Sequence, residues 1–125
     1  MRKPILLASL LALASCGASD ALGPGAPQGI EGLVLLGPMC PVVRLDDPCP
    51  DQPYQAWIDV RSAEGAIVAS VHSNEEGRFR VGLRPGAFTL VPRSGRPFPT
   101  AGESSVRVET GAYTEVTIGF DTGIR

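Results

Sequence analysis

The stretch Gly77–Val91, which reads G-R-F-R-V-G-L-R-P-G-A-F-T-L-V, constrains the fold more than any other part of the chain. From Phe79 to Leu83 every second residue is apolar and the residues between them are arginine or glycine, which is the period of a half-buried strand. Arg84-Pro85-Gly86 favours a turn, and the alternation resumes at Phe88 and Leu90. The pattern predicts a β-hairpin. Because one hairpin cannot bury its apolar face alone, a second sheet must cover it.

Five other segments have the length and composition of short strands, and residues typical of turns separate them. Alternation along them predicts inward-facing apolar residues, as in Ala56, Ile58 and Val60. The run Ala66–His72 is almost continuously apolar, so we expect it to be more buried than its neighbours. About seven strands in all predict an all-β fold, a single antiparallel Greek-key β-sandwich. The five segments are Ile30–Leu36, Gln55–Arg61, Ala66–His72, Ser104–Glu109 and Tyr113–Phe120.

The first residues have the pattern of a processing signal rather than of a folded element. Arg2-Lys3 precedes an apolar run, Ile5–Ala14, that is too short to span a bilayer comfortably. The run leads into Leu13-Ala14-Ser15-Cys16, which resembles the lipobox of bacterial lipoproteins. The resemblance implies that residues 1–15 are a signal peptide and that Cys16 carries a diacylglycerol thioether and palmitate-type acyl chains. The alternative is an ordinary secretory signal in which the cysteine occurs by chance.

The chain after the signal divides into a linker and one domain. Residues 17–29 are rich in Gly, Ala and Pro without periodicity, so residues 16–29 are expected to be the lipidated cysteine and a flexible tether with a reach of about 20 Å. Residues 30–125 then suffice for one modest core. The residue after the cysteine is Gly17 and not an aspartate, and by resemblance to known lipoprotein sorting rules this favours the outer membrane, facing the periplasm. In a cell without an outer membrane, the expected location is the outer face of the plasma membrane.

Charge argues against one class of partner. From Cys16 onward the chain has nine arginines, no lysine and thirteen acidic residues, which gives a formal net charge of −4. The basic residues do not cluster along the sequence. A mildly acidic protein without a basic patch is a poor candidate for binding nucleic acid. The expected attachment to a membrane is therefore through lipid at the cysteine and not through a charged surface.

The segment N-E-E-G-R-F-R-V-G-L-R-P-G-A-F-T-L, preceded by a G-x-V near residue 32, resembles the carboxypeptidase regulatory-like domain. That family is a transthyretin-like (prealbumin-like) Greek-key sandwich, and the resemblance covers residues 30–121. The blocks G-P-M-C-P-V, P-C-P-D-Q-P-Y and F-D-T-G-I-R look like those of small bacterial lipoproteins built from this domain alone. The resemblance implies the fold and a place in the envelope, and it implies no activity.

Two cysteines remain once Cys16 is assigned to lipid. Cys40 and Cys49 lie in a proline-rich loop, and an exported protein with an even number of remaining cysteines favours a disulfide between them. A zinc site needs four ligands at compact spacing, and His72 is the only imidazole. Three aspartates in the same loop do not have the spacing of a calcium loop, so we expect them to be solvated. They are Asp46, Asp47 and Asp51. No metal and no cofactor are expected.

Motifs that suggest catalysis have simpler interpretations. Asp121-Thr122-Gly123 resembles the signature of aspartic proteases, and the interpretation that we favour is a strand end where Asp121 caps backbone amides. His72 has no Ser or Cys partner at a recognisable spacing. The transthyretin-like family includes a hydrolase of 5-hydroxyisourate that depends on several histidines, and related iron dioxygenases use two. With one histidine, this chain is not expected to be an enzyme.

Two surface features remain as candidates for binding. Tyr54 and Trp57 follow the cysteine loop, and Trp57 is predicted to face outward, so the pair would form an aromatic ligand surface unless the loop folds back over the indole. Arg78 and Arg80, together with Arg107, are expected to lie on a solvated face and to pair with Glu109 or Glu115 across strands. The alternative is an anion site. The sequence therefore predicts a lipid-anchored, non-catalytic module that binds a protein or glycan partner in the envelope. The alternative is a purely structural spacer or accessory subunit of an envelope complex.

Overall fold

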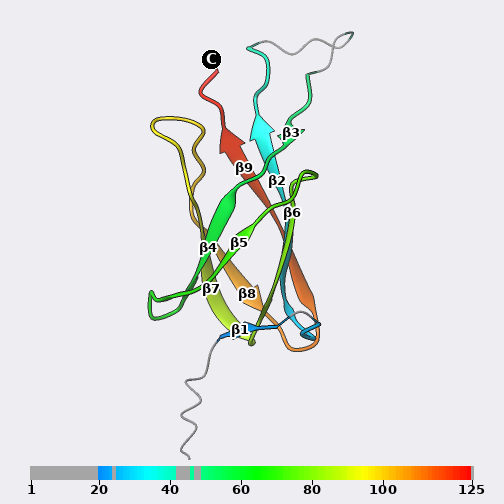
Figure 1. Cartoon of the computed structure of the whole chain (residues 1–125), viewed down its shortest axis with the longest axis vertical. Coiled ribbons are helices and arrows are strands. Elements are labelled where there is room, and N and C mark those ends of the chain that lie inside the picture. The colour runs from blue at the N-terminus through cyan, green and yellow to red at the C-terminus, as the bar shows by residue number, and fades with distance from the viewer. Residues whose placement is uncertain (1–19, 24, 42–45, 47–48, 125) are drawn as a thin grey trace, which may run out of the picture.

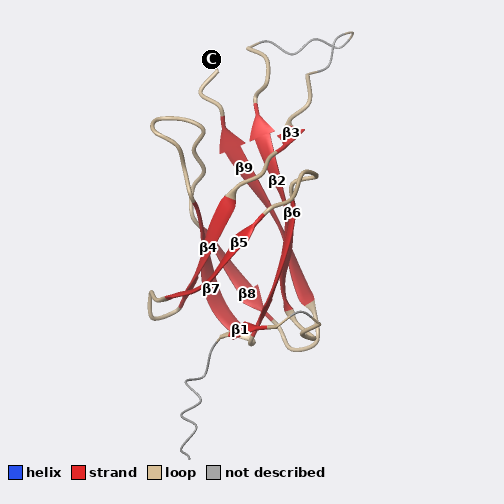
Figure 2. Cartoon of the chain, viewed as in Figure 1, coloured by secondary structure: helices blue, strands red, loops and turns tan. Residues whose placement is uncertain are grey.

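The structure is a computed structural model that describes residues 20–23, 25–41, 46 and 49–124. All the regular secondary structure of these residues is β-strand, and they contain no helix (Figure 2). Two short strands, β1 and β3, were not predicted. The strands are β1 (Ala21–Leu22), β2 (Gly29–Gly37), β3 (Gln52–Pro53), β4 (Trp57–Ser62), β5 (Ile67–His72), β6 (Arg78–Leu83), β7 (Gly86–Pro92), β8 (Ser104–Val108) and β9 (Tyr113–Asp121).

The strands form two sheets that pack face to face as a β-sandwich (Figure 1). In the first sheet β2 is central: it pairs with β9 on one side, and with β6 and β3 on the other, while β1 extends the sheet beyond β6. The second sheet has the order β5-β4-β7-β8. Every pairing is antiparallel except that of β2 with β9, which is parallel. The predicted all-β sandwich is therefore confirmed.

The predicted hairpin Gly77–Val91 is wrong, although both of its strands exist. β6 belongs to the first sheet and β7 to the second, so the turn between them crosses from one sheet to the other. The backbone groups that a hairpin would use bond elsewhere: the amide of Leu83 donates to the carbonyl of Gln28 (3.1 Å) and the amide of Arg84 donates to that of Asp20 (3.0 Å). Gly86 adopts a φ of 150°, which favours glycine at the crossing.

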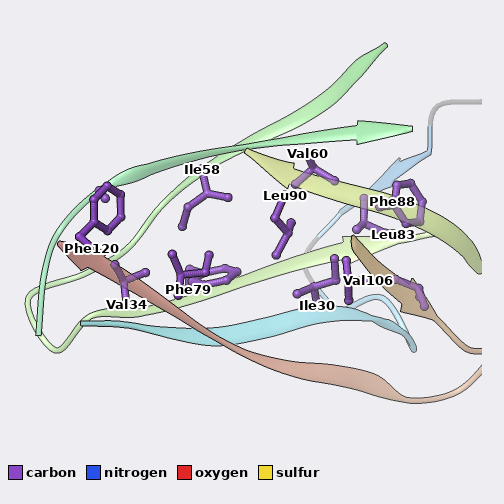
Figure 3. Close-up of a cluster of buried hydrophobic side chains, with 13 residues drawn as sticks. Ile30, Val34, Ile58, Val60, Phe79, Leu83, Phe88, Leu90, Val106 and Phe120 are labelled. Carbon is purple, nitrogen blue, oxygen red and sulfur yellow. The ribbon is translucent and has the colours of Figure 1, made fainter. Parts of the chain in front are cut away.

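The core lies between the sheets, and both supply it with alternate residues (Figure 3). The alternation predicted for β4 is confirmed, since its even-numbered apolar residues are buried. Each such large side chain contributes roughly 1.5–3 kcal/mol by leaving water. The buried apolar residues are Ile30, Val34, Ala56, Ile58, Val60, Phe79, Leu83, Phe88, Leu90, Val106, Val108, Ile118 and Phe120.

Strand β5 is more exposed than its composition predicts. It lies at the edge of the second sheet, and Ile67 is 57% exposed. A register shift between Val60 and Arg61 places Ile67 opposite Arg61, which is on the outer face. A continuous apolar run has no alternation to show which residues point inward, and the prediction of a more buried strand is wrong for that reason.

The described residues between Asp20 and Gln28, which we call the N-terminal strap, lie against the sandwich and not away from it. β1 pairs with β6, and the hydroxyl of Tyr113 donates to the carbonyl of Ala26 (2.8 Å). The side-chain Nε2 of Gln28 donates to the carbonyl of Leu83 (3.1 Å). The predicted tether, residues 16–29, therefore contains a docked segment, because its backbone finds hydrogen-bond partners that its composition does not reveal.

Candidate functional site

Trp57 lies on the outer face of the second sheet, at the start of β4. Trp57 is 46% exposed, and Phe98 is 43% exposed. The residues of β4 alternate, so Ile58 and Val60 point into the core while Trp57 points outward. The described residues of the cysteine loop leave the side chain of Trp57 open to solvent.

Tyr54 does not join Trp57 in one aromatic surface. Its ring packs edge-on against Phe120, with 5.0 Å between ring centroids, at the margin of the core. Three positions separate Tyr54 from Trp57, and an odd spacing along an extended chain directs two side chains to opposite faces. The structure therefore separates the two residues that the sequence grouped together.

Two neighbouring strands supply contacts to Trp57 instead. His72 is directly opposite on β5, and the two rings are 4.8 Å apart at an angle of 45°. Arg93 follows β7, where its amide donates to the carbonyl of Trp57 (2.9 Å). Its guanidinium carbon is 5.3 Å from the centre of the indole, within the range of a cation–π interaction.

The carboxylate of Asp59 holds Arg93 in place. The Nη2 of Arg93 donates to Oδ1 of Asp59 (2.8 Å), and its Nε lies 3.2 Å from both carboxylate oxygens. The hydroxyl of Ser70 also donates to Oδ1 (2.7 Å). The hydrogen bond from Arg93 is the main reason that the pKa of Asp59 is lowered from its usual value of 3.8, and it raises the pKa of Arg93.

We call Trp57, Asp59, Ser70, His72 and Arg93 the Trp57 cluster. It combines an open aromatic surface with a charged pair whose geometry is set before any ligand arrives, which suits recognition rather than catalysis. Ser70 donates its proton to a carboxylate that is already paired, so it does not have the arrangement of an activated nucleophile. In the part of the chain that the structure describes, no three His, Cys, Asp or Glu side chains gather as a metal site.

The sequence did not indicate most of this cluster. Asp59, Ser70 and Arg93 are far apart along the chain, and only the register of β4 with β5 and with β7 brings them together. His72 was considered alone, without its partner ring. The sequence did indicate that Asp59, two residues after Trp57 on the same strand, points outward as Trp57 does.

The outer face of the first sheet carries charges of both signs. A shallow groove of about 480 Å³ lies there, and Arg78, Arg80, Glu31 and Glu115 are among the residues that line it. Arg80 is 3.9 Å from Glu31 and lies over the ring of Tyr113 at 3.8 Å. The expected pairing of these arginines with Glu109 or Glu115 is not the one found for Arg80, because β2 and not β9 lies next to β6. The outer face of the first sheet is therefore a solvated surface with charges of both signs.

The predicted disulfide is confirmed: Cys40 and Cys49 are bonded, with their Cα atoms 6.1 Å apart. Of the three loop aspartates, Asp46 and Asp51 are exposed, and Asp47 lies outside the described residues. Cys16 and the expected signal peptide also lie outside them. Among the residues that are described, no helix has the length and apolar character needed to cross a membrane.

The triplet Asp121-Thr122-Gly123 forms the turn predicted for it. Oδ1 of Asp121 accepts a hydrogen bond from the amide of Gly123 (2.8 Å). The hydroxyl of Thr122 donates to the carbonyl of Pro38 (2.7 Å), which ties this segment to the base of the cysteine loop. Gly123 has a φ of +85° and lies against the ring of Phe98, where a side chain would clash. The triplet thus has a structural role.

Comparisons with known proteins add support for the fold alone. No family model matches the chain, and no curated protein matches it either. Among solved structures it is similar to the minor pilin GBS52 of the gram-positive pathogen Streptococcus agalactiae, with a TM-score of 0.58 and 14% sequence identity. The match covers 76% of this chain and 44% of the pilin, so this chain spans less than half of the pilin's length.

Proposed function

We propose that this protein is an exported lipoprotein, anchored through Cys16, whose β-sandwich is a non-catalytic binding module of the cell envelope. Its contact surface in this proposal is the Trp57 cluster. The observation that carries the proposal is the exposure of Trp57, 46%, beside the hydrogen-bonded pair of Asp59 and Arg93. Tryptophan and arginine are the residues that most often dominate binding energies at protein surfaces.

The chemistry of the cluster favours a particular kind of partner. Arg93 and Asp59 neutralise each other, with 2.8 Å between Nη2 and Oδ1, so a charged ligand gains little net attraction. A glycan or a polar peptide offers both apolar C–H groups for the indole and groups that bond to the remaining N–H donors of Arg93. Such a partner matches the protein or glycan partner expected from the sequence.

Two further arguments support this assignment. The segment N-E-E-G-R-F-R-V and the sandwich architecture together support a carboxypeptidase regulatory-like, transthyretin-like domain. The similarity of the fold to that of a minor pilin supports a non-catalytic surface or accessory role. The lipobox resemblance supports the anchor and the envelope location.

Photocrosslinking in intact cells tests the binding surface. A photoreactive residue at Val91, which lies opposite Asp59 on β7, should form an adduct with the partner. The matched control is the same residue at Ala87, which is exposed further along β7. In the Val91-labelled protein, Trp57→Ala should remove the adduct, because the indole supplies most of the contact. Equal yields at both positions, or an adduct that survives Trp57→Ala, would contradict the proposal.

A purely structural spacer or accessory subunit is the second candidate. The hydrogen bonds of the N-terminal strap and the disulfide hold the two ends of the sandwich, and rigidity of this kind favours a spacer. The two roles differ in one variant: Trp57→Ala should preserve the function of a spacer and abolish that of a binding module. Complementation of a deletion strain by this variant distinguishes them.

A further inference from the structure

The strap leaves little free chain between the expected lipid and the folded domain. Three residues separate Cys16 from Asp20, and Asp20 is already bonded, since its carbonyl accepts from the amide of Arg84 (3.0 Å). Four Cα–Cα steps span at most about 14 Å when fully extended. A tether of this reach is shorter than the flexible linker that composition alone predicts.

Several independent contacts hold the strap in place. The Tyr113 hydroxyl bonds to Ala26 (2.8 Å), and Gln28 bonds through its side chain to Leu83 (3.1 Å) and Gly111 (3.4 Å). Gly82 allows the close approach, because a Cβ there would lie 2.7 Å from the Cβ of Ala26. Gln28 itself is 6% exposed. These contacts make the strap part of the sandwich.

The strap lies at one end of the sandwich. β1 lies beside the turn that joins β6 to β7 and near the start of β9, whereas the cysteine loop and the C-terminal segment lie at the opposite end (Figure 1). β9 runs between the two ends over nine residues, or roughly 30 Å at 3.3 Å per residue. Trp57 opposes His72 at the end of β5 and Arg93 beyond the end of β7, which places the indole away from the strap end. Ser70, which also belongs to the cluster, lines a hollow that it shares with Leu22 and Gly23 of the strap.

We propose that the strap orients the protein on the bilayer: the end formed by the turns at 84–86 and 110–112 faces the lipid headgroups, and the cysteine loop faces away. This inference rests on the proposed lipid at Cys16 and adds the surface that meets the membrane. It also keeps the indole of Trp57 clear of the bilayer and accessible to a partner. A longer, undocked tether would permit every orientation.

The absence of lysine after Cys16 provides the means to test the orientation. A single lysine carries an amine-reactive dye either at the strap end, in Thr110→Lys, or in the loop between β7 and β8, in Arg96→Lys. Both positions are exposed. The lipidated proteins are placed in phosphatidylethanolamine–phosphatidylglycerol vesicles that contain a lipid with a nitroxide headgroup. Quenching is expected to be several-fold stronger at position 110 than at position 96.

Two further variants keep the test specific to the strap. The first inserts a Gly/Ser segment of about ten residues between Cys16 and Asp20, which lengthens the tether without touching the fold. The second, Tyr113→Phe with Gln28→Ala, removes strap contacts, and its circular dichroism is compared with that of the parent. Both should reduce the difference in quenching between the two dye positions.

The outcomes separate the orientation from the anchor. Equal quenching at positions 110 and 96 in protein that floats with the vesicles overturns the orientation and leaves the lipoprotein assignment standing. An inserted segment that leaves the difference unchanged also overturns it. Protein that does not float with the vesicles overturns the lipid anchor, and the orientation fails with it.

Discussion

The charged pair of the Trp57 cluster depends on the surroundings of one carboxylate. Asp59 has a side chain that is 15% exposed, and it accepts hydrogen bonds from Arg93 and from Ser70. These donors favour the ionised form, and the pKa of Asp59 is therefore lowered, with the hydrogen bond from Arg93 as the largest cause. Removing the carboxylate releases Arg93 from the position that it holds beside the indole.

Asp59→Asn tests this contact through the pH dependence of stability. Because the pKa of Asp59 is lower in the folded than in the unfolded protein, its contribution is complete above the usual value of 3.8 and is lost as the pH falls through the folded pKa. We expect Asp59→Asn to lower the free energy of unfolding at pH 7 by at most about 1 kcal/mol, given solvent screening of the pair. The difference from the parent should vanish in strongly acidic solution.

Urea unfolding followed at neutral and strongly acidic pH measures that difference. Glu103→Gln is the matched control, because Glu103 is 60% exposed and lies 3.8 Å from Arg61 in a looser pair. It should change neither the stability nor its pH dependence to a comparable degree. An Asp59→Asn protein that is as stable as the parent at pH 7 would show that the pair does not stabilise the fold.

Sequence patterns predicted which way a side chain points better than they predicted what it touches. Trp57 was expected to face outward and does. Ser73, in contrast, is fully buried, and its hydroxyl donates to the carbonyl of Tyr54 (2.7 Å) and accepts from the amide of Ala56 (2.8 Å). Nothing in the local sequence marks a serine between β5 and β6 as a bridge to the start of β4. Contacts of this kind depend on tertiary register, which a single sequence does not contain.

For β6 and β7 too, the sequence located the strands but did not identify their partners. Alternation located both strands almost to the residue, yet it does not identify a strand's partner, and the two lie in different sheets. Short turns between strands usually favour pairing, but here the strap takes the backbone groups that β7 would have used. The strap in turn was missed because Gly- and Pro-rich composition resembles a linker.

The disulfide is the element whose removal has the clearest expected effect. The Cys40–Cys49 bond closes a loop with a sequence separation of 9. The double substitution Cys40→Ser, Cys49→Ser should lower the free energy of unfolding by roughly 2.5–3 kcal/mol in the chain-entropy model, while the sandwich remains folded. Urea unfolding of the oxidised parent and of the double variant measures the loss.

Reduction of the parent protein provides the control for that measurement. The reduced parent should unfold at the same urea concentration as the double variant, since both lack the covalent link. Thiol labelling of the native, unreduced protein should modify neither Cys40 nor Cys49. Ready labelling of both would contradict the disulfide.

The whole molecule has two distinct ends and two distinct faces. The strap marks one end, and the cysteine loop, tied to Thr122 through Pro38, marks the other. One outer face carries mixed charges, and the other carries the Trp57 cluster. The sandwich class was predictable from strand spacing. The difference between its two ends was not predictable, because it depends on where a glycine-rich segment docks.

The proposed envelope location and the proposed orientation on the bilayer both require a lipid at Cys16. Mass spectrometry of the protein isolated from the membrane fraction of its host tests this most directly. We expect an N-terminal peptide that begins at Cys16 and carries diacylglycerol on the thiol. A soluble chain with an unmodified Cys16 would contradict it.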